Sequence, residues 1–222
     1  MRERSTPFFV DREEVGRRLA ARLEHYRGSR AIVVALPRGG VVVGYEVAST
    51  LLLPFDLLVV RKIGHPENPE LGVGALVEGA PVQLDTGMLR ALGISVADLR
   101  HRIEEEQREI IRRVQLYRGG REFMDVKGRI VLLMDDGIAT GNTAKAAIAA
   151  LRFRGARRVV LAVGVAPPAT VRELRRVADE LVCLASPPDF MAVGQFYEHF
   201  DPVEDDQVLE LMRRGQGLIP AS

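Results

Sequence analysis

Three short apolar runs constrain the fold of this chain more than any other feature of its sequence. They cover residues 31–36, 131–134 and 158–163, and Arg158 is the one polar residue among them. A run that is apolar throughout is typical of a strand buried on both faces, because a strand with one wet face alternates apolar and polar residues. Such strands occur in parallel sheets that helices cover on both sides.

Segments with helical character alternate with strands along the chain. We expect helices at about 11–27, 41–52, 95–117, 144–151, 170–178 and 203–214, and further strands at 55–60, 72–77, 82–84 and 180–184. This alternation predicts an α/β fold, a Rossmann-like parallel sheet with helices on both faces. The 222 residues suit one domain with a core at about 28–185, to which the N-terminal helix 11–27 and a hood in the tail 186–222 are appended.

Two segments outside the core are harder to interpret. Residues 63–71 are rich in glycine, proline, asparagine and glutamate, so we predict a mobile loop in which His65 is exposed rather than catalytic. The tail carries four ring side chains that either stack on a planar ligand or belong to the core, and we favour the core. They are Phe190, Phe196, Tyr197 and His199.

The composition excludes some classes of function. With 31 basic and 30 acidic residues the formal net charge is +1, which disfavours nucleic acid as the main partner. Cys183 is the single cysteine, so an internal disulfide is excluded, and a reducing cytoplasm is the expected compartment. The N-terminus has no apolar signal core and no apolar run reaches membrane-spanning length, so no membrane association is expected.

The most informative stretch is Val131–Thr143, where an apolar strand ends in Asp135 and Asp136 and a turn of small residues leads into a helix. The first amides of that helix have no partner within it and form a site for an anion such as phosphate. An ordinary strand end followed by turn residues is the alternative. A nucleotide hydrolase lacks support because the phosphate-binding Gly-x-x-x-x-Gly-Lys-Ser/Thr motif is absent, and a Gly-x-Gly-x-x-Gly dinucleotide motif is absent too.

The stretch Val131–Thr143 resembles the phosphoribosyl pyrophosphate signature of type I phosphoribosyltransferases: four apolar residues, two acids and a Thr-Gly-x-Thr turn. Two further segments are similar in the expected order. The sequence Pro37-Arg38-Gly39-Gly40 stands where the family has its pyrophosphate loop, and Arg61-Lys62 stands where its mobile loop begins. The resemblance covers roughly residues 28–185.

The resemblance implies a role for each matching residue. Arg38 and Lys62 are the implied catalytic residues, and a cis peptide bond is implied in the loop that holds Arg38. The implied substrate-binding residues are Asp135, Asp136, Gly137, Ile138, Ala139, Thr140, Gly141, Asn142 and Thr143, together with Gly39, Gly40 and Arg61. The implied cofactor is Mg²⁺, held mainly by the substrate near the two acids and without a direct protein ligand.

The activity that the resemblance implies is that of a magnesium-dependent phosphoribosyltransferase. A nitrogen nucleophile, expected to be a nucleobase, attacks the anomeric carbon of phosphoribosyl pyrophosphate, and pyrophosphate leaves while a loop at 63–80 closes over the site. We also expect a homodimer. Ala139 stands where family members that act on 6-oxopurines usually carry an acid, so the acceptor is left open.

Two other functions remain alternatives at the level of the sequence. One is a nucleotide sensor of the same fold without turnover, which binds RNA through arginines of the helix at 95–117. These arginines are Arg100, Arg102, Arg108, Arg112, Arg113 and Arg118. The other is a phosphate-ester hydrolase, which is disfavoured because no nucleophile–base pair or metal-ligand cluster is evident.

Overall fold

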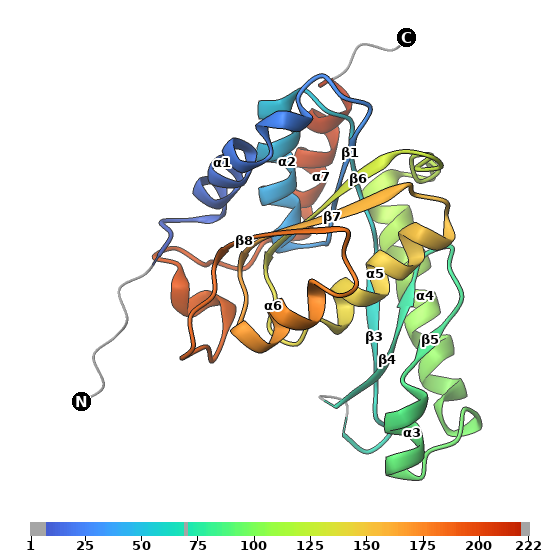
Figure 1. The fold of residues 1–222 in the computed structure, drawn as a ribbon. Coiled ribbons are helices and arrows are strands. Elements are labelled where there is room, and N and C mark those ends of the chain that lie inside the picture. Colours follow the sequence, from blue (N-terminus) through green and yellow to red (C-terminus); the bar gives the residue numbers. More distant parts are fainter. Residues whose placement is uncertain (1–7, 69–70, 219–222) are drawn as a thin grey trace.

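A five-stranded parallel sheet forms the centre of the molecule in the computed structural model, which describes residues 8–68 and 71–218 (Figure 1). The strands lie in the order β2-β1-β6-β7-β8, and every neighbouring pair is parallel. They are β1 (Ile32–Ala35), β2 (Phe55–Leu57), β6 (Ile130–Gly137), β7 (Arg158–Val165) and β8 (Glu180–Ala185). The predicted α/β fold with a parallel sheet is confirmed.

Helices cover both faces of this sheet, and the alternating side chains of the strands explain why. In β6, Leu132 and Met134 pack into a core with α1 (Arg12–Arg22) and α2 (Gly39–Leu51). Val131 and Leu133 point to the opposite face and pack against α5 (Asn142–Phe153). Each face is apolar, so the uninterrupted apolar run of the sequence corresponds to a strand with two buried faces. Two further helices pack beside this sheet, α6 (Pro168–Leu174) and α7 (Asp205–Gln216).

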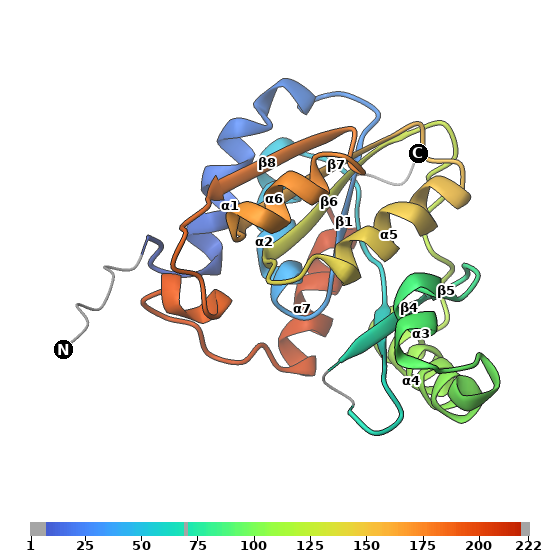
Figure 2. The same ribbon diagram turned by 60° about the horizontal axis from the view of Figure 1, so that its bottom comes forward.

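A second, antiparallel sheet extends from the β2 side of the molecule (Figure 2). It contains β3 (Val60–Gly64), β4 (Gly72–Val77) and β5 (Gln83–Leu84) in that order. The helices α3 (Thr86–Leu92) and α4 (Arg100–Arg118) follow it, with a 3₁₀ turn at Ala97–Leu99 before α4. The strands β3 and β4 contact both α4 and α5, so this sheet joins the long helix α4 to the main sheet.

Two expectations for this region need correction, and one helix was not predicted. The strand predicted at 55–60 is two strands, β2 and β3, with a break at Leu58 and Val59. The loop predicted at 63–71 begins inside β3, and a bond from His65 N–H to the carbonyl of Leu71 closes a hairpin turn; Pro69 and Glu70 lie outside the described residues. The helix α3 was not predicted, although Asp85 caps its start by accepting from Met88 N–H at 2.9 Å.

The tail and the N-terminal segment pack together as core. Phe196 is fully buried and stacks on Phe8, with ring centroids 5.6 Å apart. Tyr197 is also buried and contacts Phe9, so these two tail aromatics belong to the core, as we favoured. The first helix ends at Arg22, earlier than predicted, and a short 3₁₀ turn follows it. Among the described residues, no helix has the length and apolar character needed to cross a membrane.

Candidate functional site

The two acids of the Val131–Thr143 stretch lie in the last residues of β6 and differ in their surroundings. Asp136 is 8% exposed, and its Oδ2 accepts a hydrogen bond from Arg12 Nε at 2.7 Å. Asp135 Oδ1 accepts from the backbone N–H of Asp136 at 2.9 Å. Burial raises the pKa of Asp135 well above its usual range, and the neighbouring charge of Asp136 raises it further. The pair therefore offers one carboxylate bound to an arginine and one that resists ionisation.

The loop at 37–40 lies directly against this acidic pair. The peptide bond between Pro37 and Arg38 is cis, as the resemblance implied. A Cβ atom at Gly39 would lie 2.0 Å from Asp136 Oδ2, and one at Gly40 would lie 2.7 Å from the carbonyl oxygen of Met134. Only glycine allows so close an approach. The structure thus brings Gly39 and Gly40 to the two acids, although about 100 residues separate them in the sequence.

The turn after β6 leaves the start of α5 open. Gly141 is the N-cap residue with φ of +80°, and no side-chain oxygen among the described residues caps this helix. Ala139, Thr140, Asn142 and Thr143 are exposed. The first amides of α5 therefore have no partner within the helix and point into the turn, where they can bind an anion.

Two contacts hold this turn in place. The backbone N–H of Ile138 donates to the carbonyl of Val165 at 2.9 Å, and the hydroxyl of Thr170 donates to the carbonyl of Ala139 at 2.7 Å. A Cβ at Gly141 would lie 3.1 Å from Thr170 Cγ2. The turn is thus fixed from β7 and α6 without any use of the helix amides.

The predicted basic residues lie in different places. Arg38 is 40% exposed in its side chain and lies 3.5 Å from Glu204 and 3.7 Å from Asp205, at the start of α7. Arg61 lies within β3, not after a strand as expected, and its Nε donates to Glu106 of α4 at 2.6 Å. Lys62 is the next residue of β3, and its side chain passes Gly72, whose Cβ would lie 3.0 Å from Lys62 Cδ. Since neighbouring strand residues face opposite sides, Lys62 points away from the face that holds Arg61.

His65 and several arginines of α4 have partners within the protein. His65 lies in the hairpin turn, where its Nδ1 accepts from the backbone N–H groups of Glu67 and Asn68 at 3.0 and 3.3 Å, a structural contact. The arginines of α4 do not form one basic face. Arg112 and Arg113 both bind Glu109, and Arg118 is buried against Glu78. Three of the six arginines named for an RNA-binding patch are thus paired with carboxylates, and RNA binding stays a prediction.

Three residues hold the site together through contacts that the sequence did not predict, although Tyr197 was already expected to belong to the core. Arg12 of α1 binds Asp136, and its guanidinium also stacks on Phe200 at 3.9 Å from the ring centroid. The hydroxyl of Tyr197 donates to the carbonyl of Asp136 at 2.6 Å. Thr170 is the third. These contacts join residues 124, 61 and 31 positions apart in the sequence, so no local pattern could have predicted them.

The acids suit a metal that the substrate carries rather than a site built by the protein alone. Within residues 8–68 and 71–218, no three histidine, cysteine, aspartate or glutamate side chains gather as a metal site. Mg²⁺ is commonly held by one or two carboxylates together with substrate phosphates. Asp135 and Asp136, beside an open helix start, fit that arrangement.

The sequence matches the phosphoribosyl transferase domain family over residues 11–200. Two curated Mycobacterium tuberculosis proteins, from strains CDC 1551 and H37Rv, are 44% identical to this chain over 206 residues. Both carry a provisional name as phosphoribosyl transferases. The match covers 93% of this chain and 46% of each relative, so the chain spans about half the length of these relatives.

Solved structures agree in fold. The protein TT1426 from Thermus thermophilus is 40% identical with a TM-score of 0.79, and the match covers 93% of this chain and 98% of that one. A hypothetical protein from Neisseria gonorrhoeae, solved with bound ppGpp, is 12% identical with a TM-score of 0.51, covering 97% of this chain and 99% of that one, and is similar in fold alone. From the match over residues 11–200 and the 44% identity to named relatives, this chain belongs to the phosphoribosyl transferase domain family.

Proposed function

We propose that this domain transfers the ribose 5-phosphate group of phosphoribosyl pyrophosphate to a nitrogen nucleophile, a nucleobase or small amine, and releases pyrophosphate. The observation that carries the proposal is the contact between three segments far apart in the sequence. Asp135 and Asp136 lie against Gly39 and Gly40, and the uncapped start of α5 follows the acids within a few residues. A sugar with a phosphate at each end needs such a set of groups.

Each part of the substrate has a partner of matching chemistry. The backbone amides from Ala139 to Thr143, with the hydroxyls of Thr140 and Thr143, bind the 5-phosphate at the helix start. Asp135 and Asp136 accept hydrogen bonds from the two ribose hydroxyls. The loop at 37–40 receives the pyrophosphate, because its glycines leave room for a phosphate oxygen near the backbone.

The chemistry asks for positioning and for stabilisation of the leaving charge. Bond breaking at the anomeric carbon builds positive charge on the ring and negative charge on pyrophosphate. Arg38 can turn to the pyrophosphate, since its contacts with Glu204 and Asp205 are long and exposed and therefore weak. Lys62 is the second cation proposed for this role. Arg61, bound to Glu106, is better suited to fixing β3 on α4.

Mg²⁺, when bound with the substrate, supplies positive charge at the diphosphate oxygens and lowers the energy of the leaving group. Asp135 and Asp136 would help to place this ion, and the bound substrate would supply most of its ligands. The hairpin of β3 and β4, rather than a loop over 63–80, is the element that can shield this reaction from water. Its turn alone, at 65–71, is free of regular structure in the described residues.

The experiment is an acceptor screen that measures pyrophosphate release from phosphoribosyl pyrophosphate in the presence of Mg²⁺. Nucleobases and small amines are offered one at a time to the wild type and to Asp135→Asn and Asp136→Asn. Asp206→Asn is the matched control, because Asp206 is an exposed carboxylate at the start of α7. Release that depends on one acceptor, survives in the control and is lost in both site variants supports the proposal. Equal release of pyrophosphate by all four proteins contradicts the proposal.

A further inference from the structure

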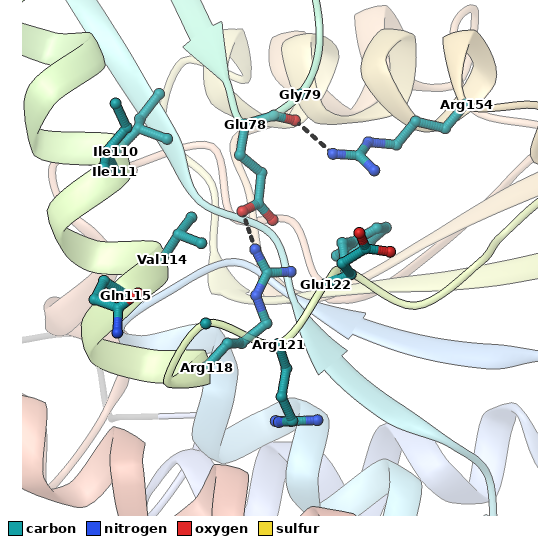
Figure 3. A pocket seen from close by; sticks show the side chains of 12 residues that line it. Glu78, Gly79, Ile110, Ile111, Val114, Gln115, Arg118, Arg121, Glu122 and Arg154 are labelled. Atoms are coloured by element: carbon teal, nitrogen blue, oxygen red, sulfur yellow. Dashed lines mark hydrogen bonds and ion pairs between the residues drawn. The ribbon is translucent and has the colours of Figure 1, made fainter.

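A cavity of about 570 Å³ lies where α4, the end of β4 and the end of α5 meet (Figure 3). It is separate from the candidate phosphoribosyl site. The open turn of that site is at the start of α5, whereas the cavity is lined by Arg154, the residue that ends the helix. A helix of twelve residues is about 18 Å long, so the two sites lie at opposite ends of α5.

The walls of the cavity are apolar on two sides. Ile110, Ile111 and Val114 of α4 line one side, as Figure 3 shows. Phe123, in the segment after α4, lines another part, and its ring faces the guanidinium of Arg154 at 4.7 Å and that of Arg118 at 5.5 Å. Ile111 is 68% exposed, which is unusual for a large apolar residue and leaves the α4 side open to a partner.

The base of the cavity is a buried ion pair with unused hydrogen-bonding capacity. Arg118 binds Glu78, and their side chains are only 2% and 6% exposed. Yet Nε and Nη1 of Arg118, Nε of Arg154 and Oε1 of Glu78 have no hydrogen-bond partner in the described part of the chain. Asp56 lies 3.8 Å from Arg118 Nη1, too far for a hydrogen bond. A buried polar group without a partner is destabilising, so a molecule that pairs with these atoms gains binding energy.

The charges select the class of that molecule. An anion would meet the carboxylates of Glu78 and Glu122, and a cation would meet the guanidinium groups of Arg118, Arg121 and Arg154. The unpaired atoms are three donors, on Arg118 and Arg154, and one acceptor, on Glu78, and a ring amide offers both the C=O and the N–H that complement them. The apolar walls and the ring of Phe123 favour a flat body, and the volume lies in the usual range for small-molecule sites.

We propose that this cavity binds a neutral, planar heterocycle whose lactam or carboxamide edge pairs with Arg118 and Glu78. Gln115 and Glu122 at the rim are exposed side chains that turn aside as the ring enters. The ligand then touches α4, β4 and α5 together. It holds the antiparallel sheet against the main sheet, and its binding does not depend on the proposed phosphoribosyl transfer.

The test is methyl NMR on protein labelled at the isoleucine δ1 positions, because isoleucines report on both sites. Ile110 and Ile111 line the cavity, and Ile138 lies in the turn before α5. Hypoxanthine, uracil and nicotinamide are the probes, and purine, pyrimidine and pyridine are the matched rings that lack the amide edge. At least one amide ring is expected to shift the Ile110 and Ile111 methyls with a dissociation constant of about 1 mM or tighter, and about tenfold more tightly than its matched ring.

Three outcomes overturn the proposal. One is the absence of any shift at Ile110 and Ile111 with all three amides up to about 10 mM. A second is an equal response to purine, pyrimidine or pyridine, which would mean an apolar cleft without amide recognition. The third is a shift at Ile138 alone, which would place the heterocycle in the phosphoribosyl site. That last result leaves the proposed function standing, so the two failures can be told apart.

Variants of α4 test whether the heterocycle binds within this cavity. Val114→Trp fills the cavity and is expected to remove the Ile110 and Ile111 response, whereas His101→Trp, at an exposed position near the start of α4 and outside the cavity lining, keeps it within about twofold. Ile111→Glu is a second variant for the case in which Val114→Trp does not fold, since Ile111 is exposed. It is expected to weaken binding about tenfold. Unchanged binding in the folded variants contradicts the proposal.

Discussion

Arg12 and Asp136 lie 124 residues apart in the sequence and form an ion pair with 2.7 Å between Nε and Oδ2, at the centre of the candidate site. Both side chains are 12% exposed. The same arginine stacks on Phe200 and donates to the carbonyl of Asp201. The pair therefore connects the first helix and the tail to the acid that the proposal assigns to the ribose.

Replacing Arg12 tests how much this ion pair contributes to the free energy of unfolding. Arg12→Gln leaves the carboxylate of Asp136 partly buried without its cation and next to Asp135, so the free energy of unfolding is expected to fall by about 3 kcal/mol. Arg17→Gln is the control on the same helix, because Arg17 lies 3.7 Å from Glu13 with more than half of each side chain exposed, and a change below about 0.5 kcal/mol is expected. Urea unfolding measures both values, and equal losses contradict the account.

The second prediction concerns Asp135 and pH. Burial and the charge of Asp136 raise the pKa of Asp135 in the folded state above its unfolded value. The contribution of Asp135 to the free energy of unfolding is therefore fully present below the pKa that it has in the unfolded chain. It is lost as the pH rises through the pKa of the folded state. Asp135→Asn is therefore expected to be more stable than the wild type at neutral pH, with a gap that narrows as the pH falls toward about 4. A gap that widens on acidification, in urea titrations over a pH series, is the contrary result.

Gly39 provides a steric test of the loop at 37–40. A methyl group at this position would lie 2.0 Å from Asp136 Oδ2, so Gly39→Ala must displace the acid or the loop. We expect a loss of about 1–3 kcal/mol in unfolding free energy and weaker binding of phosphoribosyl pyrophosphate. Gly87→Ala in α3 is the control, since its new methyl would lie 3.4 Å from the nearest atom, an ordinary contact. Calorimetric binding that is the same in both variants would argue against this loop as the pyrophosphate site.

Thr170 tests the support of the turn before α5. Thr170→Val removes the hydroxyl that donates to the carbonyl of Ala139 at 2.7 Å while it keeps the shape of the side chain. The expected cost is about 1 kcal/mol in stability, and phosphoribosyl pyrophosphate binds about three- to tenfold more weakly because the helix amides lose their fixed direction. Thr50→Val, at an exposed position near the end of α2, is the control and is expected to leave affinity unchanged. An equal effect of the two variants on affinity would show that Thr170 does not support the binding turn.

Much of the fold could be predicted because the evidence for it is local. The apolar runs at β1, β6 and β7 are buried on both faces, and that property is visible in the residues themselves. The acids and the small-residue turn likewise lie within one stretch. The strand β4 was predicted at 72–77, but its pairing with β3 was not, because Ile63 and Gly64 at the end of β3 were assigned to the loop that follows. Its pairing partners become evident only once the chain folds.

The part of the site that could not be predicted depends on contacts at long range. Arg12, Thr170 and Tyr197 each reach the β6 end through a single hydrogen bond, and nothing in the residues beside them in the sequence indicates that contact. Arg61 shows that a residue's place in the sequence does not reveal its partner. It stood in a suggestive place beside Lys62, yet its guanidinium binds Glu106 on α4, a partner 45 residues away.

The most direct measurement for the central claim is calorimetric titration of phosphoribosyl pyrophosphate with Mg²⁺ into the wild type, Asp136→Asn and Asp206→Asn. The account predicts saturable binding to the wild type and to Asp206→Asn, and a loss of about 1.5–3 kcal/mol in binding free energy for Asp136→Asn, because a hydrogen bond to a charged group disappears. Circular dichroism and urea unfolding verify that all three proteins are folded. If the folded wild type gives no heat of binding, or if Asp136→Asn binds as tightly as Asp206→Asn, the ribose is not where we propose.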